Sequence, residues 1–302
     1  MLAGVANFRD FGGYRIREGR SLRAGVLVRC RHLAGATQED IEKFMALGLS
    51  IIVDLRRASE RARQPTGRWA DRCRSIRSDL GGDDDPWWTF LRDSDLSAAS
   101  IRGYLMDFDC RLLFDPPYID LFSRFFEALA TTTGPLLVHC TGGKDRTGMI
   151  VALTHRLLDV HPDDIISDYL LSNRVWEFDL HGASVASWIA EVIGRTPGQA
   201  GVRAVMEVDP TYLDASFAAI EAQSGSLDAY FETVLGITRA ARDAIAFRLL
   251  TKANITQQTS PTEQHWYVLA LVEALSWLTA DTVRDDDEIL PVNGLQSSIG
   301  EA

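Results

Sequence analysis

The sequence predicts an α/β protein in which a mostly parallel central sheet is flanked by helices, followed by a helical C-terminal half. Up to about residue 160, short β-branched or aliphatic runs alternate with amphipathic stretches, a pattern typical of alternating strands and helices. From Pro162 onward the apolar spacing is helical almost throughout. The chain has 302 residues, of which 46% are apolar and 24% charged, so it can form a packed core and is not a disordered chain.

The elements of the first half follow from local signals. Strands are predicted at residues 26–29, 51–55, 73–77 and 136–138. Between the first two strands, Thr37 is expected to cap a helix that has Glu39 and Asp40 in its first turn. Further helices are predicted at residues 117–131 and 146–158.

The segment from residue 81 to about 115 breaks this alternation. It begins GGDDDP and continues with two tryptophans and a stretch rich in Ser and Asp up to about residue 100. Such a composition favours a surface loop, so we expect a lid-like insertion here. The helices predicted after it cover residues 162–172, 174–193, 210–223, 226–235 and 238–250.

We divide the chain into one domain, residues 1–250, and a C-terminal extension, residues 251–302. The extension starts with a polar linker at 251–261 and contains one nearly all-apolar helix at 265–279. That helix is too short to cross a bilayer comfortably. We expect it to pack against the body of the protein or against a second subunit, which leaves a homo-oligomer open.

Charge and cysteine content narrow the class of protein further. Residues 1–77 carry 16 basic and 8 acidic side chains, whereas residues 78–302 carry 15 and 34. A net charge of −11 makes nucleic acid an unsuitable partner, although the basic quarter still allows a local anion site. The four cysteines form no CxxC pair, so reduced thiols and no metal site are expected. Without a signal sequence we expect a soluble, cytoplasmic protein, with export by a dedicated route left open.

Residues 136–149, LLVHCTGGKDRTGM, have the pattern of a phosphate-binding loop. A cysteine six residues before an arginine is weak evidence alone, but here an apolar strand ends at Cys140 and an apolar helix starts near Arg146. In a strand–loop–helix arrangement successive backbone N–H groups converge on one point, where a phosphate can bind. The phosphate-binding residues predicted on this basis are Thr141, Gly142, Gly143, Lys144, Asp145 and Arg146.

The same geometry predicts the chemistry. Cys140 at the positive end of a helix is favoured as a thiolate, which can attack phosphorus and form a phosphocysteine. The planar fork of Arg146 can bind two phosphate oxygens and stabilise the charge of the transition state. We expect Thr147 to donate a hydrogen bond to the leaving sulfur, the alternative being an ordinary hydroxyl at the start of the helix, and we expect His139 to order the loop. The alternative is a purely structural Cys140, packed as a small apolar residue at the end of a strand. It does not explain the two glycines or Arg146.

The loop and several other segments resemble the bacterial cysteine-dependent tyrosine phosphatases with the loop HCxxGKDRTG, a group of triple-specificity type that also acts on phosphoinositides. The matching segments are Asn7 to Asp10 with Gly12 and Gly13, Val53 to Arg56 with Glu60, Asp168 to Asn173, Tyr212 with Leu213, and Gly225 to Tyr230. The resemblance covers about residues 5–250 and implies the tyrosine-phosphatase fold. It departs at Cys30 and Arg31, where the family usually has Ser and a small residue.

Lys144 and Asp145 distinguish this group from classical tyrosine phosphatases. Lys144 either adds positive charge for substrates with more than one phosphate, such as phosphoinositides, or points outward into solvent. The resemblance favours Asp145 as the general acid that protonates the leaving oxygen. Three other candidates for the acid stay open: Asp79, Asp107 and Asp109.

The basic N-terminal quarter is given a role by the same resemblance. We expect Arg9, Arg29 and Arg56 to lie beside the loop and raise the positive potential for a dianionic substrate. Other arginines are expected at the solvated surface.

The leading prediction is therefore a phosphomonoesterase that needs no metal or other cofactor and acts on phosphotyrosine proteins, with phosphoinositide as a further substrate. One alternative keeps the mechanism but uses a phosphorylated small metabolite. A second, of another class, is a catalytically silent phosphate-binding module. A sulfur-transfer enzyme would also use a loop cysteine, but it need not keep a threonine after the arginine.

Overall fold

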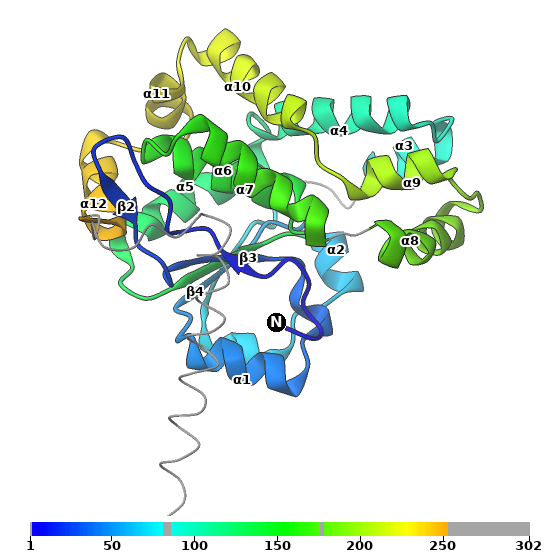
Figure 1. Ribbon diagram of the computed structural model, residues 1–302, viewed down its shortest axis with the longest axis horizontal. Coiled ribbons are helices and arrows are strands. Elements are labelled where there is room, and N and C mark those ends of the chain that lie inside the picture. Colours follow the sequence, from blue (N-terminus) through cyan, green and yellow to red (C-terminus); the bar gives the residue numbers. More distant parts are fainter. Residues whose placement is uncertain (1, 81–85, 176–177, 253–302) are drawn as a thin grey trace, which may run out of the picture.

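A five-stranded sheet forms the centre of the protein in the computed structural model, which describes residues 2–80, 86–175 and 178–252 (Figure 1). The strand order is β1-β3-β6-β4-β5, with β1 antiparallel to its neighbour and the other four strands parallel. The bounds are β1 Arg9–Asp10, β3 Leu27–Cys30, β6 Leu136–His139, β4 Ile51–Asp54 and β5 Arg74–Arg77. The predicted α/β class and mostly parallel sheet are confirmed.

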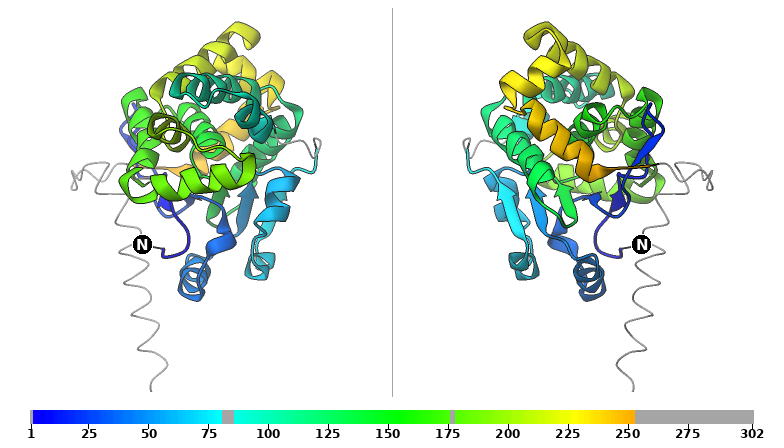
Figure 2. Two further views of the ribbon diagram at one scale, coloured as in Figure 1. Left: turned by 90° about the vertical axis from the view of Figure 1, so that its right-hand side faces the viewer. Right: turned by 90° about the vertical axis from the view of Figure 1, so that its left-hand side faces the viewer.

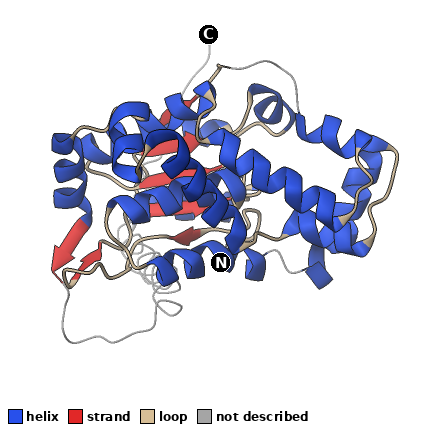
Figure 3. Ribbon diagram, turned by 90° about the horizontal axis from the view of Figure 1, so that it is seen from above, coloured by secondary structure: helices blue, strands red, loops and turns tan. Residues whose placement is uncertain are grey.

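The three central strands are buried at every position because helices cover both faces of the sheet (Figure 3). Helix α1 (Gln38–Ala46) packs on one face through Phe44. Helices α5 (Pro116–Thr131) and α6 (Asp145–Leu157) pack on the other face. This double cover explains why the strands of a parallel sheet are apolar without alternation. In register, Cys30, His139 and Asp54 end the three strands side by side.

The predicted cap of α1 is present. The Thr37 side chain accepts the Asp40 N–H, and the Asp40 carboxylate accepts the Thr37 N–H at 3.1 Å. The same carboxylate also accepts the N–H groups of Ala3 and Gly4, at 2.8 and 2.7 Å. One buried side chain therefore starts a helix and fixes the N-terminal segment against it.

Most predicted helices of the second half are found within a few residues of their expected ends. They are α7 Pro162–Val175, α8 Phe178–Ile193, α10 Pro210–Ser224, α11 Leu227–Ala229 continued by the π-helical turn η3 Tyr230–Val234, and α12 Arg239–Leu249. Sequence analysis missed α9 (Gln199–Met206) and three short strands. These are the edge strand β1 of the main sheet and the strands β2 (Arg20–Leu22) and β7 (Leu250–Lys252), which pair with each other. It also missed three short helical elements: α2 Ala58–Arg63 and the 3₁₀ helices Leu33–Gly35 and Arg68–Arg72.

The expectation of a loop between residues 87 and 100 was wrong. The chain forms helix α3 (Pro86–Asp93) and then α4 (Ala98–Leu112), which Ser97 caps. Trp88 and Leu91 are buried on one face of α3, in a cluster with residues of α4 and α8, so tertiary packing outweighs the Ser- and Asp-rich local composition. Residues 81–85, which begin the predicted insertion, lie outside the described residues.

Helices α3, α4, α8 and α9 form a layer beside the sheet rather than on either of its faces (Figures 1 and 2). Helix α4 contacts α9 and α10, and α3 contacts α8. The apolar helix predicted at 265–279 lies outside the described residues. In the ranges that are described, no helix combines the length and apolar character needed to cross a bilayer.

Candidate active site

The loop between β6 and α6 has the geometry expected of an anion-binding loop. Cys140 follows the last strand residue and is almost fully buried, and its Sγ accepts the N–H of Gly143 at 3.2 Å. Gly143 has a φ of 68°, and a Cβ there would lie 2.4 Å from the carbonyl oxygen of Cys30. Only glycine combines this left-handed conformation with so close a neighbour, so the loop path depends on it.

Two side chains from the N-terminal part hold the loop from below. The Gly143 carbonyl accepts hydrogen bonds from Asn7 Nδ2 and Arg29 Nη2, both at 2.8 Å. Because the N–H and C=O of a trans peptide point in opposite directions, this fixes the Lys144 N–H on the opposite side, toward the interior of the loop. Asn7 and Arg29 therefore fix the orientation of the Lys144 N–H, and neither of them lines the pocket.

Both of these side chains belong to a buried ionic network centred on Asp168 of α7. The Asp168 carboxylate is 2.8 Å from Arg29 Nη1 and 3.4 Å from Arg9 Nε, and it accepts the Tyr14 hydroxyl at 3.3 Å. Arg56 is likewise buried and binds Asp54 through two hydrogen bonds, at 2.8 and 2.7 Å. All three arginines are buried and paired with carboxylates, and none of them lines the pocket. Arg29 contacts the loop directly, and Arg9 and Arg29 share the one carboxylate of Asp168, so their expected contribution to the positive potential at the loop stays a prediction.

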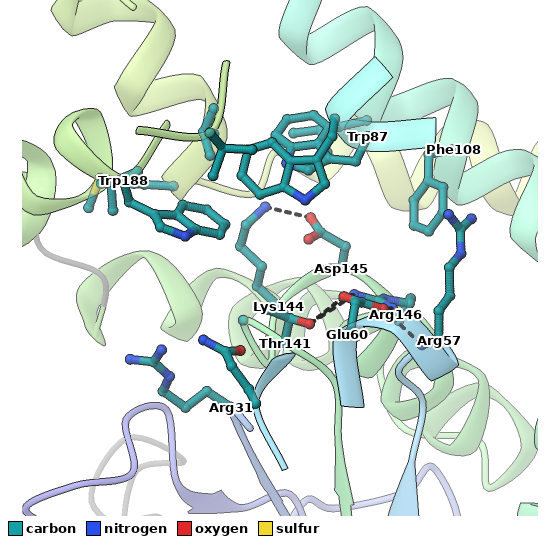
Figure 4. Close-up of a pocket in the computed structure, with 18 of the residues that line it drawn as sticks. Arg31, Arg57, Glu60, Trp87, Phe108, Thr141, Lys144, Asp145, Arg146 and Trp188 are labelled. Atoms are coloured by element: carbon teal, nitrogen blue, oxygen red, sulfur yellow. Dashed lines mark hydrogen bonds and ion pairs between the residues drawn. The ribbon is translucent and has the colours of Figure 1, made fainter. Parts of the chain in front are cut away.

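Arg146 is held by Glu60, a residue of α2 that sequence analysis quoted but gave no role. The two Nη atoms of Arg146 bind the two carboxylate oxygens at 2.6 and 2.7 Å (Figure 4). Glu60 also accepts the Arg57 N–H at 2.9 Å and the Thr141 hydroxyl. Such a forked pair fixes the guanidinium plane. Burial alone would raise the pKa of Glu60, but Arg146 and the Thr141 hydroxyl hold it well below its usual range.

The signal that could have identified Glu60 is its place in α2. It stands three residues after the helix N-cap, Arg57, whose N–H its side chain accepts. This position directs the carboxylate back toward the end of β4, where the loop also lies. Its distance from Arg146 in the sequence, 86 residues, hides the contact.

Lys144 and Asp145 are both in the wall of the pocket above the loop. Lys144 Nζ donates a hydrogen bond to Asp145 Oδ1 at 2.6 Å, below the ring of Trp87 (Figure 4). Lys144 is 8% exposed, so of the two alternatives the outward, solvated lysine is excluded.

The four candidate acids are placed very differently. Asp145 lines the pocket. Asp79 is exposed and paired with Arg61, and Asp107 is exposed on α4. Asp109 is completely buried behind the pocket wall. Among the four, only Asp145 faces the space that a substrate can enter.

His139 and Thr147 are buried beside the loop. His139 Nδ1 lies 3.4 Å from the Cys140 carbonyl oxygen, and its Nε2 is 3.8 Å from Asp54. Burial lowers the pKa of His139, so a supporting role in the neutral form fits its position. The Thr147 hydroxyl makes no hydrogen bond to a described residue. Its predicted bond to the Cys140 sulfur is therefore not formed in this state.

The pocket above the loop is a cavity of about 690 Å³. Its upper walls come from α3, α4 and α8 and are mostly aromatic or aliphatic (Figure 4). The principal apolar side chains are Trp87, Trp88, Tyr104, Leu105, Phe108, Tyr118, Val185 and Trp188. The basic side chains are Arg31, Arg57, Arg63, Lys144 and Arg146. Two carboxylates, Glu60 and Asp145, also line it, so the pocket carries excess positive charge at its base and an apolar roof.

A thiol at the base of a glycine-containing loop, with an arginine in the first turn of the helix that follows, defines the class of cysteine-dependent phosphatases. Comparison with known proteins agrees with this assignment. The profile of the tyrosine phosphatase family matches residues 1–251, and the chain belongs to this family.

Two relatives align over most of the chain. A protein of Cupriavidus necator, named as a candidate tyrosine-protein phosphatase, is 32% identical over 77% of this chain and 82% of its own length. The triple specificity protein phosphatase PtpB of Mycobacterium tuberculosis is 28% identical over 79% of this chain and 94% of its own. A tyrosine-protein phosphatase of Nostoc commune is 32% identical over about half of each chain. The chain is therefore a phosphatase.

Proposed function

We propose that the enzyme hydrolyses phosphomonoesters through a phosphocysteine on Cys140, with phosphotyrosine proteins as its main substrates. The observation that carries this proposal is the fork of Arg146. Glu60 holds its guanidinium plane at 2.6 and 2.7 Å, at the start of the helix that follows the thiol. An arginine fixed in this way is prepared to bind two phosphate oxygens without losing further side-chain freedom.

In the first step, Sγ of Cys140 attacks phosphorus as the ester oxygen leaves. The loop N–H groups and Arg146 bind the equatorial oxygens, whose charge they stabilise in the transition state. Asp145 protonates the leaving oxygen, since it is the candidate acid that lines the pocket. A sulfur–phosphorus bond replaces the oxygen–phosphorus bond.

In the second step, water attacks the phosphocysteine and the sulfur leaves. Asp145, now a carboxylate, takes a proton from this water. Rotation of the buried Thr147 hydroxyl would let it donate to the leaving sulfur. Because cationic side chains and N–H groups already meet the charge of the phosphate, we propose that no metal is required.

The cavity supports a bulky leaving group. Its volume of about 690 Å³ and its roof of tryptophan and phenylalanine rings suit an aryl phosphate and the peptide around it better than a small polar metabolite. The basic side chains Arg31, Arg57 and Lys144 line the same cavity, so a phosphoinositide with further phosphates is a second substrate. The name of the Mycobacterium tuberculosis relative, a triple specificity phosphatase, agrees with more than one substrate class.

The proposal is tested by a hydrolysis panel run in excess EDTA. The panel compares a phosphotyrosine peptide, a phosphoserine peptide, phosphoinositide vesicles and sugar phosphates, with free phosphate as the readout. We expect turnover of the phosphotyrosine peptide and of the phosphoinositide in chelator. Activity confined to sugar phosphates would overturn the substrate proposal, and activity restored only by a divalent ion would overturn metal independence.

A further inference from the structure

The cavity contains an arginine, Arg31, that takes no part in the two chemical steps. Arg31 directly follows β3, and its side chain lines the cavity. At this position the family usually has a small residue, so whatever Arg31 adds to the site is particular to this chain.

The backbone around Arg31 meets the loop between β6 and α6 at two points. A Cβ on Gly143 would lie 2.4 Å from the Cys30 carbonyl oxygen and 2.7 Å from the Arg31 nitrogen, so the two backbones are in direct contact. One residue further on, the His32 N–H donates a hydrogen bond to the Thr141 carbonyl at 3.2 Å. The Arg31 side chain therefore starts directly beside the loop.

The imidazole ring of His32 orients the guanidinium of Arg31. Nη2 of Arg31 and Nε2 of His32 are 2.6 Å apart. A guanidinium can only donate, so the ring nitrogen accepts and the imidazole is neutral. Burial, together with the positive charge of Arg31, lowers the pKa of His32 to about 3, so the ring stays an acceptor at neutral pH. This contact fixes the direction of Arg31 and adds no negative charge to it.

The other cations near the loop are placed differently. Arg146 is paired with Glu60 and has the reacting phosphate as its proposed ligand, and Lys144 is paired with Asp145. Figure 4 shows Arg31 and Arg57 on opposite sides of Lys144. Arg31 is thus a cation beside the loop but separate from the group that binds the reacting phosphate.

We propose that Arg31 forms a subsite for a second phosphate group, carried by the substrate next to the one that is hydrolysed. This rests on the proposed function, in which the first phosphate is bound by the loop and Arg146. The planar guanidinium can donate two parallel hydrogen bonds to a phosphate, which an ammonium group cannot.

The ligand class that fits this subsite is an inositol headgroup with phosphates on neighbouring ring carbons, either free or in a lipid. A rigid ring presents both phosphates side by side, one to the loop and one to Arg31. Neighbouring side chains of an extended peptide point to opposite sides, so a peptide with two adjacent phosphates presents only one of them in this way.

Paired substrates test the subsite. Phosphate release is measured from a dioctanoyl phosphatidylinositol bisphosphate with neighbouring phosphates and from the two corresponding monophosphates. The readout is kcat/KM for the bisphosphate divided by that for the faster monophosphate, because a general loss of positive charge lowers both values together. In Arg31→Gln this ratio should fall about tenfold or more, as expected when a charge-assisted contact is lost.

Three further variants sharpen the test. Arg31→Lys keeps the charge and loses the fork, so the ratio should recover only in part. His32→Leu keeps the charge of Arg31 but removes the acceptor that orients it, so the ratio should fall by a smaller factor, about threefold. Arg17→Gln, at an exposed arginine outside the cavity, is the matched control and should leave the ratio unchanged. Thermal unfolding of each variant shows that the measured changes belong to folded protein.

The outcomes that overturn the subsite are distinct. An unchanged ratio in Arg31→Gln overturns it, and full recovery in Arg31→Lys overturns the forked contact. A ratio that falls for doubly phosphorylated tyrosine peptides but not for inositol phosphates overturns the ligand class. The same ratio measured with free inositol phosphates identifies the source: a fall in both series assigns the headgroup alone, and a fall in the lipid series alone assigns the lipid.

Failure of the proposed function gives a different result. If the wild type releases phosphate from none of these inositol substrates, the proposed second substrate class is wrong and the subsite falls with it. If the wild type hydrolyses them and Arg31→Gln keeps the wild-type ratio, only the subsite is wrong.

Discussion

At the scale of single residues, the role of Cys140 depends on ionisation rather than on size. Cys140→Ser replaces sulfur by oxygen at a buried position and keeps the packing, but a hydroxyl is not ionised at neutral pH and cannot attack phosphorus. We expect turnover to be abolished and the unfolding temperature to stay within a few degrees of the wild type. Steady-state hydrolysis and thermal unfolding check this together. A variant with more than about a tenth of the wild-type rate would contradict the covalent mechanism.

A second residue-scale prediction concerns the fork of Arg146. Glu60→Gln removes the charge of the partner and leaves only one oxygen to accept from the guanidinium. Loss of a charge-assisted hydrogen bond of about 1.5–3 kcal/mol should lower kcat/KM roughly ten- to hundredfold, because the arginine is no longer fixed for the transition state. Phosphotyrosine peptide kinetics provide the measurement. The control is Glu39→Gln on α1, where an exposed carboxylate pairs with Lys43 and no effect is expected. If Glu60→Gln keeps the wild-type kcat/KM, Glu60 does not position Arg146 for catalysis.

At the scale of elements, the stability of the fold should depend strongly on the side chain that caps the start of α1. The buried carboxylate of Asp40 accepts N–H groups from Ala3, Gly4 and Thr37, so Asp40→Ala removes the acceptor of three backbone donors at once. We expect a loss of about 1–3 kcal/mol in the free energy of unfolding, measured by urea denaturation. Glu42→Ala, on the exposed side of the same helix, should cost less than about 0.5 kcal/mol.

The loss in Asp40→Ala should also depend on pH. Burial alone would raise the pKa of Asp40, but hydrogen bonds from Thr37, Gly4 and Ala3 lower it below its usual range. A carboxyl group with a lowered pKa in the folded state stabilises the fold at pH values above its unfolded pKa of about 3.9, and this contribution is lost as the pH falls through the folded value. The difference between wild type and Asp40→Ala should therefore be full at pH 7 and shrink below about pH 4. A difference that grows on acidification would contradict this assignment.

At the scale of the whole molecule, the network around Asp168 connects three distant parts of the chain. It joins Arg9 on β1, Arg29 on β3 and, through Arg29, the carbonyl of Gly143 in the loop. Asp168→Asn leaves two buried arginines without their partner charge. We expect the free energy of unfolding to fall by about 3–5 kcal/mol, because removing one partner of a buried ion pair leaves an uncompensated charge in the interior.

Activity should fall in the same variant even where it stays folded. The Arg29 side chain would no longer be fixed below Gly143, so kcat/KM is expected to drop at temperatures well below the unfolding transition. Asp163→Asn, an exposed carboxyl group on the same helix, is the matched control for both measurements. Unchanged activity in folded Asp168→Asn would show that Asn7 alone holds the loop.

The sequence by itself determined the local features of this protein. The α/β class, the central strands, the Thr37 cap and the loop around Cys140 were predicted because each rests on residues near one another in the chain. Apolar runs, cap residues and a glycine-rich turn carry their physical cause within about ten residues. The resemblance to cysteine-dependent tyrosine phosphatases followed from such segments.

Only the tertiary structure decided which distant charges meet. It buried Arg9, Arg29 and Arg56 and paired them with carboxylates, and it joined Glu60 to Arg146 across 86 residues. It also folded the segment after residue 85 into helices α3 and α4, since their apolar faces are buried against α8 and α9. Burial and ion pairing depend on which elements pack together, and this cannot be inferred from the order of residues within any one of them.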